Sequence, residues 1–279
     1  MPVPFDPVKV AGKAGKKPRV LVVANQKGGV GKTTPAINLG TALAAVGQPT
    51  LILDIDPQGN ASTGLGIHQP DRKTTIYDVL MGDATLAEAV MATRIPGLSL
   101  IASTVDLSGA ELELIGNPRR NFILKDALAD LAANQTERFS YVLIDCPPSL
   151  TLLTVNAMAA ADAVVVPLQC EFFALEGLSQ LLKTIGLVRA KLNPELDIQG
   201  IVLTMFDKRN RLSDQVAADV RQHMGDKVYD TIIPRNVRIS EAPSHGLPAL
   251  VYDLRCPGSQ AYIKLAGELI KRERARLAA

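Results

Sequence analysis

Short apolar runs alternate with longer amphipathic segments along most of the chain, and this alternation constrains the fold more than any other feature. Runs of about four to eight apolar residues are typical of strands buried on both faces, and the segments between them have a helical period. The predicted strands are Val20–Ala24, Thr50–Ile55, Leu98–Ala102, Tyr141–Ile144, Ala163–Pro167, Ile198–Thr204 and Val228–Ile233. The predicted helices are Thr33–Val46, Arg120–Ala133, Leu150–Ala160, Leu175–Lys191, Leu212–His223 and Ser259–Arg276. This order predicts an α/β fold with a central, mostly parallel sheet and helices on both faces.

The domain organisation follows from the continuity of that pattern. The chain has 279 residues, and no repeat or internal linker interrupts the alternation. We therefore expect one domain over residues 19–279, although the length alone allows two. Residues 1–18 are rich in proline, glycine and lysine and have no apolar period, which is typical of a flexible tail. The first twenty residues carry a charge of +4, whereas the whole chain carries +2, so the remainder is slightly acidic.

Composition excludes several classes of protein. A net charge of +2 argues against a uniformly basic DNA-coating protein but allows a local basic patch. The cysteines Cys146, Cys170 and Cys256 are far apart, so we expect buried reduced thiols rather than disulfides or a zinc site. We find no signal-peptide pattern, and polar residues interrupt the longest apolar stretch, so the expected compartment is the cytoplasm.

The segment Asn25–Thr34 lies where the first predicted strand ends and the first predicted helix begins. It contains a variant of the phosphate-binding loop G-x-x-x-x-G-K-[ST], in which the first glycine is replaced and an extra lysine, Lys27, is present. Glycines let backbone N–H groups approach phosphate oxygens, and the helix N-terminus favours negative charge. Lys32 can reach the β- and γ-phosphates, and the Thr33 hydroxyl can ligate Mg²⁺. The predicted phosphate-binding residues are Lys27, Gly28, Gly29, Val30, Gly31, Lys32, Thr33 and Thr34.

Acidic residues follow two of the predicted strands. Asp54 and Asp56 end the second strand, and Asp145 ends the strand that begins at Tyr141. Ligands of open α/β sheets bind beyond the carboxyl ends of the strands, so these carboxylates are expected to converge on the phosphate loop. Asp145 is the candidate for holding Mg²⁺ through water, and Asp56 the candidate for orienting the attacking water. Asp54 is expected to support the site by hydrogen bonding.

These motifs resemble those of the deviant Walker ATPases and, among them, the ParA/Soj chromosome-partitioning proteins. The resemblance covers about residues 19–265 and rests on residues 27–34, 54–60, 142–148, 167–177 and 233–244. The block I-P-R-N-V-R-I-S-E-A-P-S at 233–244 is the most specific of these, whereas sister families share the phosphate loop.

The resemblance implies a cytoplasmic, nucleoid-associated ATPase that uses ATP and Mg²⁺ and forms a homodimer around ATP. In that picture Lys27 reaches the nucleotide of the second subunit, and Lys27, Lys32 and Asp56 form the catalytic group. It also implies that Pro234 and Asn236 line the adenine, with Met205 a further candidate.

The resemblance further implies that Arg209 and Arg238 bind double-stranded DNA without sequence preference. Arginine suits this role because its planar guanidinium binds phosphate and stays charged. Two copies of a weak patch in a dimer raise avidity, so binding should depend on ATP and fall with salt. A ParB-type centromere-binding partner is expected to stimulate an otherwise slow hydrolysis.

Four other functions share parts of the pattern. A membrane-associated positioning ATPase of the MinD type would need an amphipathic membrane helix at the end of the chain, but Glu268 and Glu273 interrupt the basic face there. A nitrogenase-type reductase would need cysteines in a downstream loop, and an ATP-dependent ligase would need a second small-molecule pocket that no segment suggests. A GTPase is disfavoured because the guanine motif N-K-x-D is absent.

Overall fold

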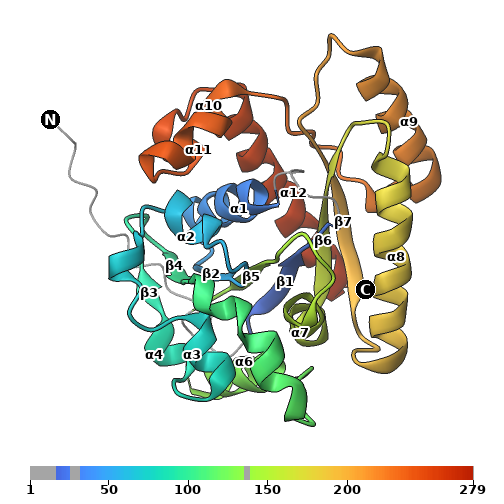
Figure 1. Cartoon of the computed structure of the whole chain (residues 1–279). Helices are drawn as coiled ribbons and strands as arrows, with labels where there is room; N and C mark the ends of the chain where they lie inside the picture. Colours follow the sequence, from blue (N-terminus) through green and yellow to red (C-terminus); the bar gives the residue numbers. More distant parts are fainter. Residues whose placement is uncertain (1–16, 26–31, 135–138, 279) are drawn as a thin grey trace, which may run out of the picture.

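A seven-stranded sheet forms the centre of the molecule (Figure 1). The computed structural model describes residues 17–25, 32–134 and 139–278. The strands are β1 (Arg19–Val23), β2 (Thr50–Asp54), β3 (Met91–Ala92), β4 (Leu98–Ile101), β5 (Tyr141–Asp145), β6 (Ala163–Gln169) and β7 (Asp197–Thr204). Their order across the sheet is β3-β4-β2-β5-β1-β6-β7, and every pairing is parallel except that of β3 with β4. The predicted α/β fold is confirmed, and six of the seven predicted strands form within two residues of their expected bounds.

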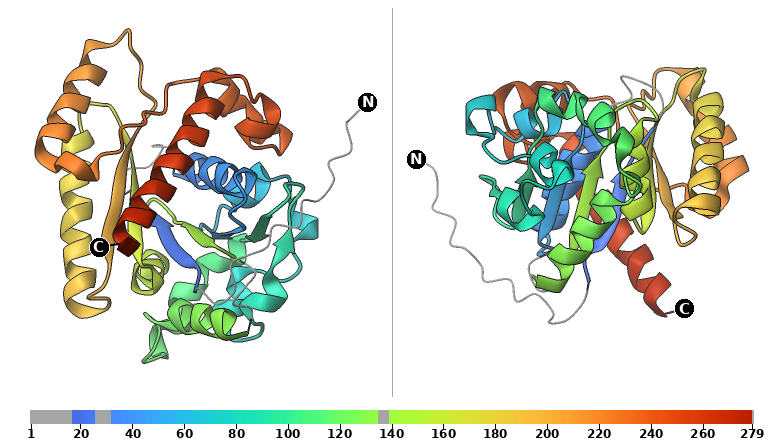
Figure 2. Two further views of the ribbon diagram at one scale, coloured as in Figure 1. Left: turned by 180° about the vertical axis from the view of Figure 1, so that it is seen from behind. Right: turned by 60° about the horizontal axis from the view of Figure 1, so that its bottom comes forward.

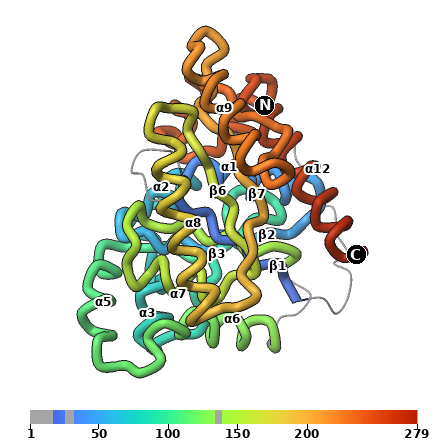
Figure 3. The backbone as a smooth tube through the Cα atoms, turned by 90° about the vertical axis from the view of Figure 1, so that its right-hand side faces the viewer, coloured from blue at the N-terminus to red at the C-terminus, as the bar shows by residue number. Residues whose placement is uncertain are grey.

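Helices cover both faces of the sheet (Figures 1 and 2). One face carries α1 (Thr33–Ala45), α2 (Asn60–Gly64), α10 (Val237–Glu241), α11 (Ala249–Tyr252) and α12 (Pro257–Ala278). The other carries α3 (Ile76–Met81), α4 (Leu86–Ala89), α5 (Ala110–Glu113), α6 (Ile123–Asn134), α7 (Leu152–Ala160), α8 (Ala174–Lys191) and α9 (Arg211–Met224). Short 3₁₀ turns complete the described part of the chain: η1 (Gln69–Asp71), η2 (Val105–Ser108), η3 (Leu114–Gly116), η4 (Gly225–Lys227) and η5 (Ala242–His245). Figure 3 shows α8 and α9 over β6 and β7.

The sheet separates two hydrophobic cores. Val20 and Val22 of β1 pack into the core under α6, α7 and α8, whereas Leu21 and Val23 pack into the core under α1 and α12. Successive side chains of a strand point to opposite faces, so each strand must be apolar at every position when both faces are covered. This requirement explains why the strands appear in the sequence as unbroken apolar runs.

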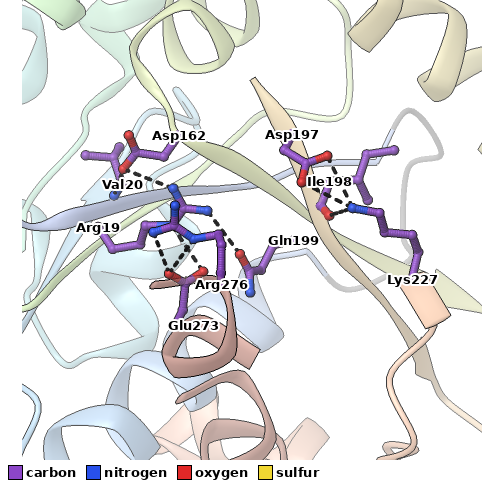
Figure 4. Close-up of polar contacts among 9 residues, drawn as sticks. All are labelled: Arg19, Val20, Asp162, Asp197, Ile198, Gln199, Lys227, Glu273 and Arg276. Carbon is purple, nitrogen blue, oxygen red and sulfur yellow. Dashed lines mark hydrogen bonds and ion pairs between the residues drawn. The ribbon is translucent and has the colours of Figure 1, made fainter. Parts of the chain in front are cut away.

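The last helix, α12, packs along α1 (Figure 2). Its Leu265 and Leu269 are buried. Near its end Glu273 accepts a hydrogen bond from Arg19 Nε of β1 at 3.2 Å and another from Arg276 Nη2 at 3.1 Å (Figure 4). This helix therefore packs on the domain through its apolar face and is tied to β1 by Glu273. Of the helices in the described ranges, none has the length and apolarity needed to cross a membrane.

The predicted strand Val228–Ile233 was wrong. Its first residue forms an isolated bridge with Ile201 of β7, and the N–H groups of Tyr229 and Ile233 donate to carbonyls of β7 at 2.9 Å, but no continuous ladder forms. The backbone N–H groups of Asp230 and Thr231 donate to the Glu268 carboxylate of α12 at 2.9 and 3.0 Å, and not to a neighbouring strand. The Glu268 side chain thus takes the N–H groups in the middle of the segment, between the two residues whose N–H groups reach β7.

Residues 60–116 contain short helices that the apolar pattern does not predict. Two of them begin with capping boxes, in which Thr75 exchanges hydrogen bonds with Asp78 and Thr85 with Glu88. These helices have six and four residues. They are too short to show a 3.6-residue period, so capping residues define them instead.

Candidate functional site

The carboxyl ends of β1, β2 and β5 meet at one edge of the sheet. Asp145, the last residue of β5, pairs in register with Val23 of β1 on one side and with Asp54 of β2 on the other. The two carboxylates therefore stand on adjacent strands, and both residues are completely buried. The edge also lies beside the start of α1, which is the usual place for a ligand in an open α/β sheet.

Asp145 has a buried carboxylate whose two oxygens accept no hydrogen bond from the described residues. Burial raises the pKa of Asp145 well above its usual range, and the charges of Asp54 and Asp56 act in the same direction. The nearby Thr33 hydroxyl and Lys32 ammonium lower that pKa. A buried carboxylate is costly unless it is paired or bound to a cation.

Lys32 stands at the N-cap of α1 and is only 7% exposed. Burial lowers the pKa of its ammonium, while the charges of Asp145 and Asp56 raise it. The N–H groups in the first turn of a helix have no acceptor within the helix, and Pro35 lies in that turn without an N–H of its own. First-turn N–H groups and a buried ammonium are the kinds of group that bind an anion at the start of a helix.

Asp54 holds the loop that carries Asp56. Its carboxylate accepts hydrogen bonds from the backbone N–H of Ser62 at 2.8 Å, from Ser62 Oγ at 2.7 Å and from the backbone N–H of Asp56 at 3.3 Å. Ser62 Oγ in turn accepts from the N–H of Ser103, which follows β4. Asp56 closes the loop by accepting from the N–H of Gln58 at 3.0 Å.

Arg72 supports the same loop, although sequence reasoning did not identify it. Its guanidinium donates to the carbonyls of Ile67 and Ser103 and to Thr63 Oγ1, at 2.8 to 3.1 Å. Gly59 lies against it with φ of 61°, and a Cβ there would stand 2.3 Å from Arg72 Nη1. Arg72 and Ser62 were missed because their partners are distant in the sequence and no motif joins them.

The pKa of Asp54 predicts a pH dependence of stability. Burial raises that pKa to about 6, against the hydrogen bonds from Ser62 that lower it. The folded protein therefore holds a proton that the unfolded chain has lost, so this residue stabilises the fold at low pH and ceases to do so as pH rises through about 6. As pH rises from 4.5 to 7.5, this residue should cost the wild type about 2 kcal/mol in free energy of unfolding. Asp54→Asn has no carboxyl group to titrate at this position, so it should not show this loss.

Urea unfolding at the two pH values measures this change. The control is Asp71→Asn, because Asp71 is exposed and its substitution removes the same charge. If both variants follow the wild-type pH dependence, the raised pKa of Asp54 is contradicted.

A second pair of loops lies side by side at the ends of β7 and of the segment before α10. Phe206 and Pro234 form a parallel bridge, and the N–H of Phe206 donates to the carbonyl of Ile233 at 3.1 Å. Met205 has a φ of 52°, the one positive value among the described non-glycine residues. Asn236 caps α10 by accepting from the N–H of Arg238 at 2.9 Å. The structure thus brings the three predicted adenine residues onto two adjacent loops.

The two arginines predicted to bind DNA extend from these loops. Arg209 follows Phe206 and is 88% exposed in its side chain, and Arg238 lies in the first turn of α10 and is half exposed. Both form ion pairs with carboxylates of the same chain. They are therefore accessible to a large anion, but each guanidinium is already paired with a carboxylate.

Part of the predicted site lies outside the described residues: Lys27, Gly28, Gly29, Val30 and Gly31. Within the described residues, no group of three or more histidine, cysteine, aspartate or glutamate side chains is arranged to hold a metal ion. Mg²⁺ does not require such a group of protein ligands, because this ion keeps several waters and binds one or two protein oxygens together with phosphates. The unpartnered Asp145 carboxylate and the nearby Thr33 hydroxyl fit that requirement.

Known proteins resemble this chain over nearly its whole length. Residues 18–198 match the family described as AAA domain. The chromosome partitioning protein ParA of Caulobacter vibrioides is 66% identical over 93% of this chain and 97% of that protein. The sporulation initiation inhibitor protein Soj of Bacillus subtilis is 50% identical over 90% and 98%. Cobyrinic acid a,c-diamide synthase from Mycobacterium smegmatis, solved with a bound ATP analog and magnesium, has a TM-score of 0.80 and 37% identity over 92% of this chain and 96% of that one.

Sequence identity distinguishes the two partitioning proteins from the synthase. ParA and Soj match at 66% and 50%, whereas the synthase shares the fold at 37%. The match to ParA and Soj also extends well past residue 198, where the AAA domain match ends. The chain therefore belongs to the ParA/Soj family of chromosome-partitioning ATPases.

Proposed function

We propose that this protein is an ATP-dependent switch for DNA segregation on the nucleoid. ATP binding drives dimerisation and non-specific DNA binding, and hydrolysis, stimulated by a ParB-type partner, releases the DNA. The observation that supports this proposal most is the buried Asp145 carboxylate, which accepts no hydrogen bond from the described residues and lies beside Lys32 at the start of α1. Such a group needs a cation, and Mg²⁺ bound with ATP supplies one.

In this proposal the phosphate loop from Lys27 to Thr34 surrounds the triphosphate. Lys32 neutralises charge on the β- and γ-phosphates, and Thr33 with Asp145 holds Mg²⁺, Asp145 acting through water. Mg²⁺ supplies neutralisation of the charge that develops on the phosphates during transfer. Asp56 orients the attacking water, and its position depends on Asp54 and Ser62.

The dimer would form through the edge of the sheet that carries the site. Phe172 and Phe173 lie between β6 and α8 at this edge, 75% and 59% exposed, with ring centroids 5.0 Å apart. Leu150, in the loop after β5, is 48% exposed. Exposed aromatic residues beside a site are typical of an interaction surface, and a second copy bound at this edge would cover them. Lys27 of each copy would then reach the nucleotide of the other.

Nucleotide and DNA would act on the same two loops. Met205, Pro234 and Asn236 are proposed to line the adenine, and Arg209 and Arg238 follow them within four residues. The bridge between Phe206 and Pro234 joins the loops. Binding of ATP at the proposed adenine residues can therefore shift the two arginines directly, because both sets of residues belong to the same two loops.

The switch is tested by the size of the protein and by its retention of random-sequence duplex DNA at low salt. With ATP and Mg²⁺ we expect a dimer that retains DNA, and with ADP a monomer that does not. Arg238→Glu should reduce DNA affinity by roughly tenfold or more and still dimerise, because reversal of charge replaces attraction to phosphate with repulsion. Arg119→Glu is the control, because Arg119 is also exposed and ion-paired but lies before α6.

Two outcomes contradict the proposal. Equal DNA retention with ATP and ADP would exclude a nucleotide switch. ATP turnover without any DNA retention would favour a metabolic ligase built on the same fold.

A further inference from the structure

We propose that Asp207 and Glu241 set the DNA affinity of this protein, because each holds a DNA-facing arginine in an ion pair that a phosphate must replace. This inference rests on the proposed DNA-binding role of Arg209 and Arg238. It adds a class of residue to that surface: carboxylates that weaken DNA binding by one subunit, so that retention depends on two subunits acting together.

Asp207 binds Arg209 with both carboxylate oxygens. Arg209 Nε donates to Oδ1 at 3.0 Å and Nη2 donates to Oδ2 at 2.8 Å, in the two-bond geometry that guanidinium also uses for phosphate. The backbone N–H of Arg209 donates to the same Oδ1 at 3.0 Å. These hydrogen bonds lower the pKa of Asp207 to about 2, and the charge of Arg235 acts in the same direction. The carboxylate is therefore ionised at neutral pH and competes directly with a phosphate.

Glu241 holds Arg238 in a comparable way. Arg238 Nη1 donates to Glu241 Oε2 at 3.0 Å, and Nε lies 3.7 Å from Asp253 Oδ2. The guanidinium also lies 6.0 Å from the ring centroid of Tyr252, which stacks on His245. Arg238 thus has two acidic neighbours and an aromatic one, and a phosphate must displace at least Glu241 to form a two-bond contact.

The ion pairs of Arg209 and Arg238 should affect DNA binding in the same way. An exposed ion pair contributes little to stability, but it must break before the arginine can neutralise a phosphate. Each pair should therefore reduce DNA affinity by a few-fold. A dimer carries two copies of each pair, so the loss in affinity of one subunit is offset only when both subunits contact the same DNA. Subunits that separate after hydrolysis would then leave the DNA readily.

The test compares Asp207→Asn, Glu241→Gln and the double variant with wild type in binding random-sequence duplex DNA, with ATP and with ADP. The amide side chains keep an oxygen that accepts the loop hydrogen bond at residue 207, so the backbone should be preserved. Asp126→Asn is the matched control, because it also removes a carboxylate from a two-bond arginine pair, with Arg119 at 2.7 and 3.0 Å, at another place on the surface.

Each single variant should bind DNA about threefold more tightly in ADP, and the double variant about tenfold, with the larger relative gain in ATP because a dimer carries two copies of each pair. The dependence of affinity on salt concentration should also become steeper, because more arginine charge is available to displace counterions. The Asp126→Asn control should change neither quantity. A control that gains as much affinity as the variants would show that only net charge matters, and weaker binding by the variants would show that the carboxylates position the arginines for DNA. Either result overturns the inference.

Failure of the underlying DNA-binding role gives a different result. If Arg209→Ala and Arg238→Ala leave DNA affinity unchanged, the DNA surface lies elsewhere and the proposed function must be revised. If those two variants lose affinity while Asp207→Asn and Glu241→Gln do not gain it, the DNA surface stands and only the role of the carboxylates is contradicted.

Discussion

Lys32→Ala should reduce ATP affinity by roughly a hundredfold. The ammonium is buried at the N-cap of α1, where the charges of Asp145 and Asp56 act on it. Hydrogen bonds from a charged group each contribute about 1.5 to 3 kcal/mol, and a buried ammonium has little water to screen it. Without Lys32, the triphosphate would also meet the carboxylates Asp56 and Asp145 with less compensating charge.

The measurement is a titration with a fluorescent ATP analogue, accompanied by circular dichroism to show that the variant is folded. Lys125→Ala is the matched control, because Lys125 is exposed on α6 and its removal changes the net charge equally. Unchanged ATP affinity in a folded Lys32→Ala protein would refute the assignment of the phosphate site to the start of α1.

Asp56→Ala should stop ATP turnover, by roughly a hundredfold or more, while ATP-dependent dimers persist. A residue that orients or activates water commonly contributes a factor of this size or larger. Asp56 is buried at 7% exposure and is not used for a strand pairing, and its side chain accepts a hydrogen bond from the N–H of Gln58 in its own loop. Loss of the carboxylate should therefore spare ATP binding.

Asp56→Asn separates the charge from the loop geometry, because its amide oxygen can still accept from the N–H of Gln58. Both variants should lose turnover if the charge matters. Asp71→Ala, on an exposed 3₁₀ turn, is the control and should keep full activity. A variant that remains monomeric with ATP would indicate a structural role for Asp56 in place of a catalytic one.

The main architecture could be predicted from the sequence because burial on both faces forces each central strand to be apolar throughout. The position of Asp54 and Asp145 also follows from the sequence, since parallel strands must end at the same edge of the sheet. Their unequal surroundings do not follow from it. Among the described residues, Asp54 has three hydrogen-bond donors and Asp145 has none, and this difference depends on Ser62 in a short helix that lacks a recognisable period.

Long-range side-chain contacts account for most of what could not be predicted. Glu268 takes the backbone hydrogen bonds of residues 230 and 231 from 37 or 38 positions away, which interrupts the predicted strand. Arg72 reaches Ser103 across 31 residues. Asp207 and Glu241 stand only two and three residues from their arginines, yet their pairing depends on loop geometry that no residue pattern specifies.

The bridge between Phe206 and Pro234 has a thermodynamic consequence. It joins the loop of the adenine candidate Met205 to the loop of Asn236 and Arg238, so ATP and DNA would bind to the same pair of connected loops. Coupling between binding sites is reciprocal: if ATP raises the affinity for DNA by some factor, DNA must raise the affinity for ATP by the same factor. Chromosomal DNA would then also act as an allosteric effector, because it would increase the retention of nucleotide by the subunits bound to it.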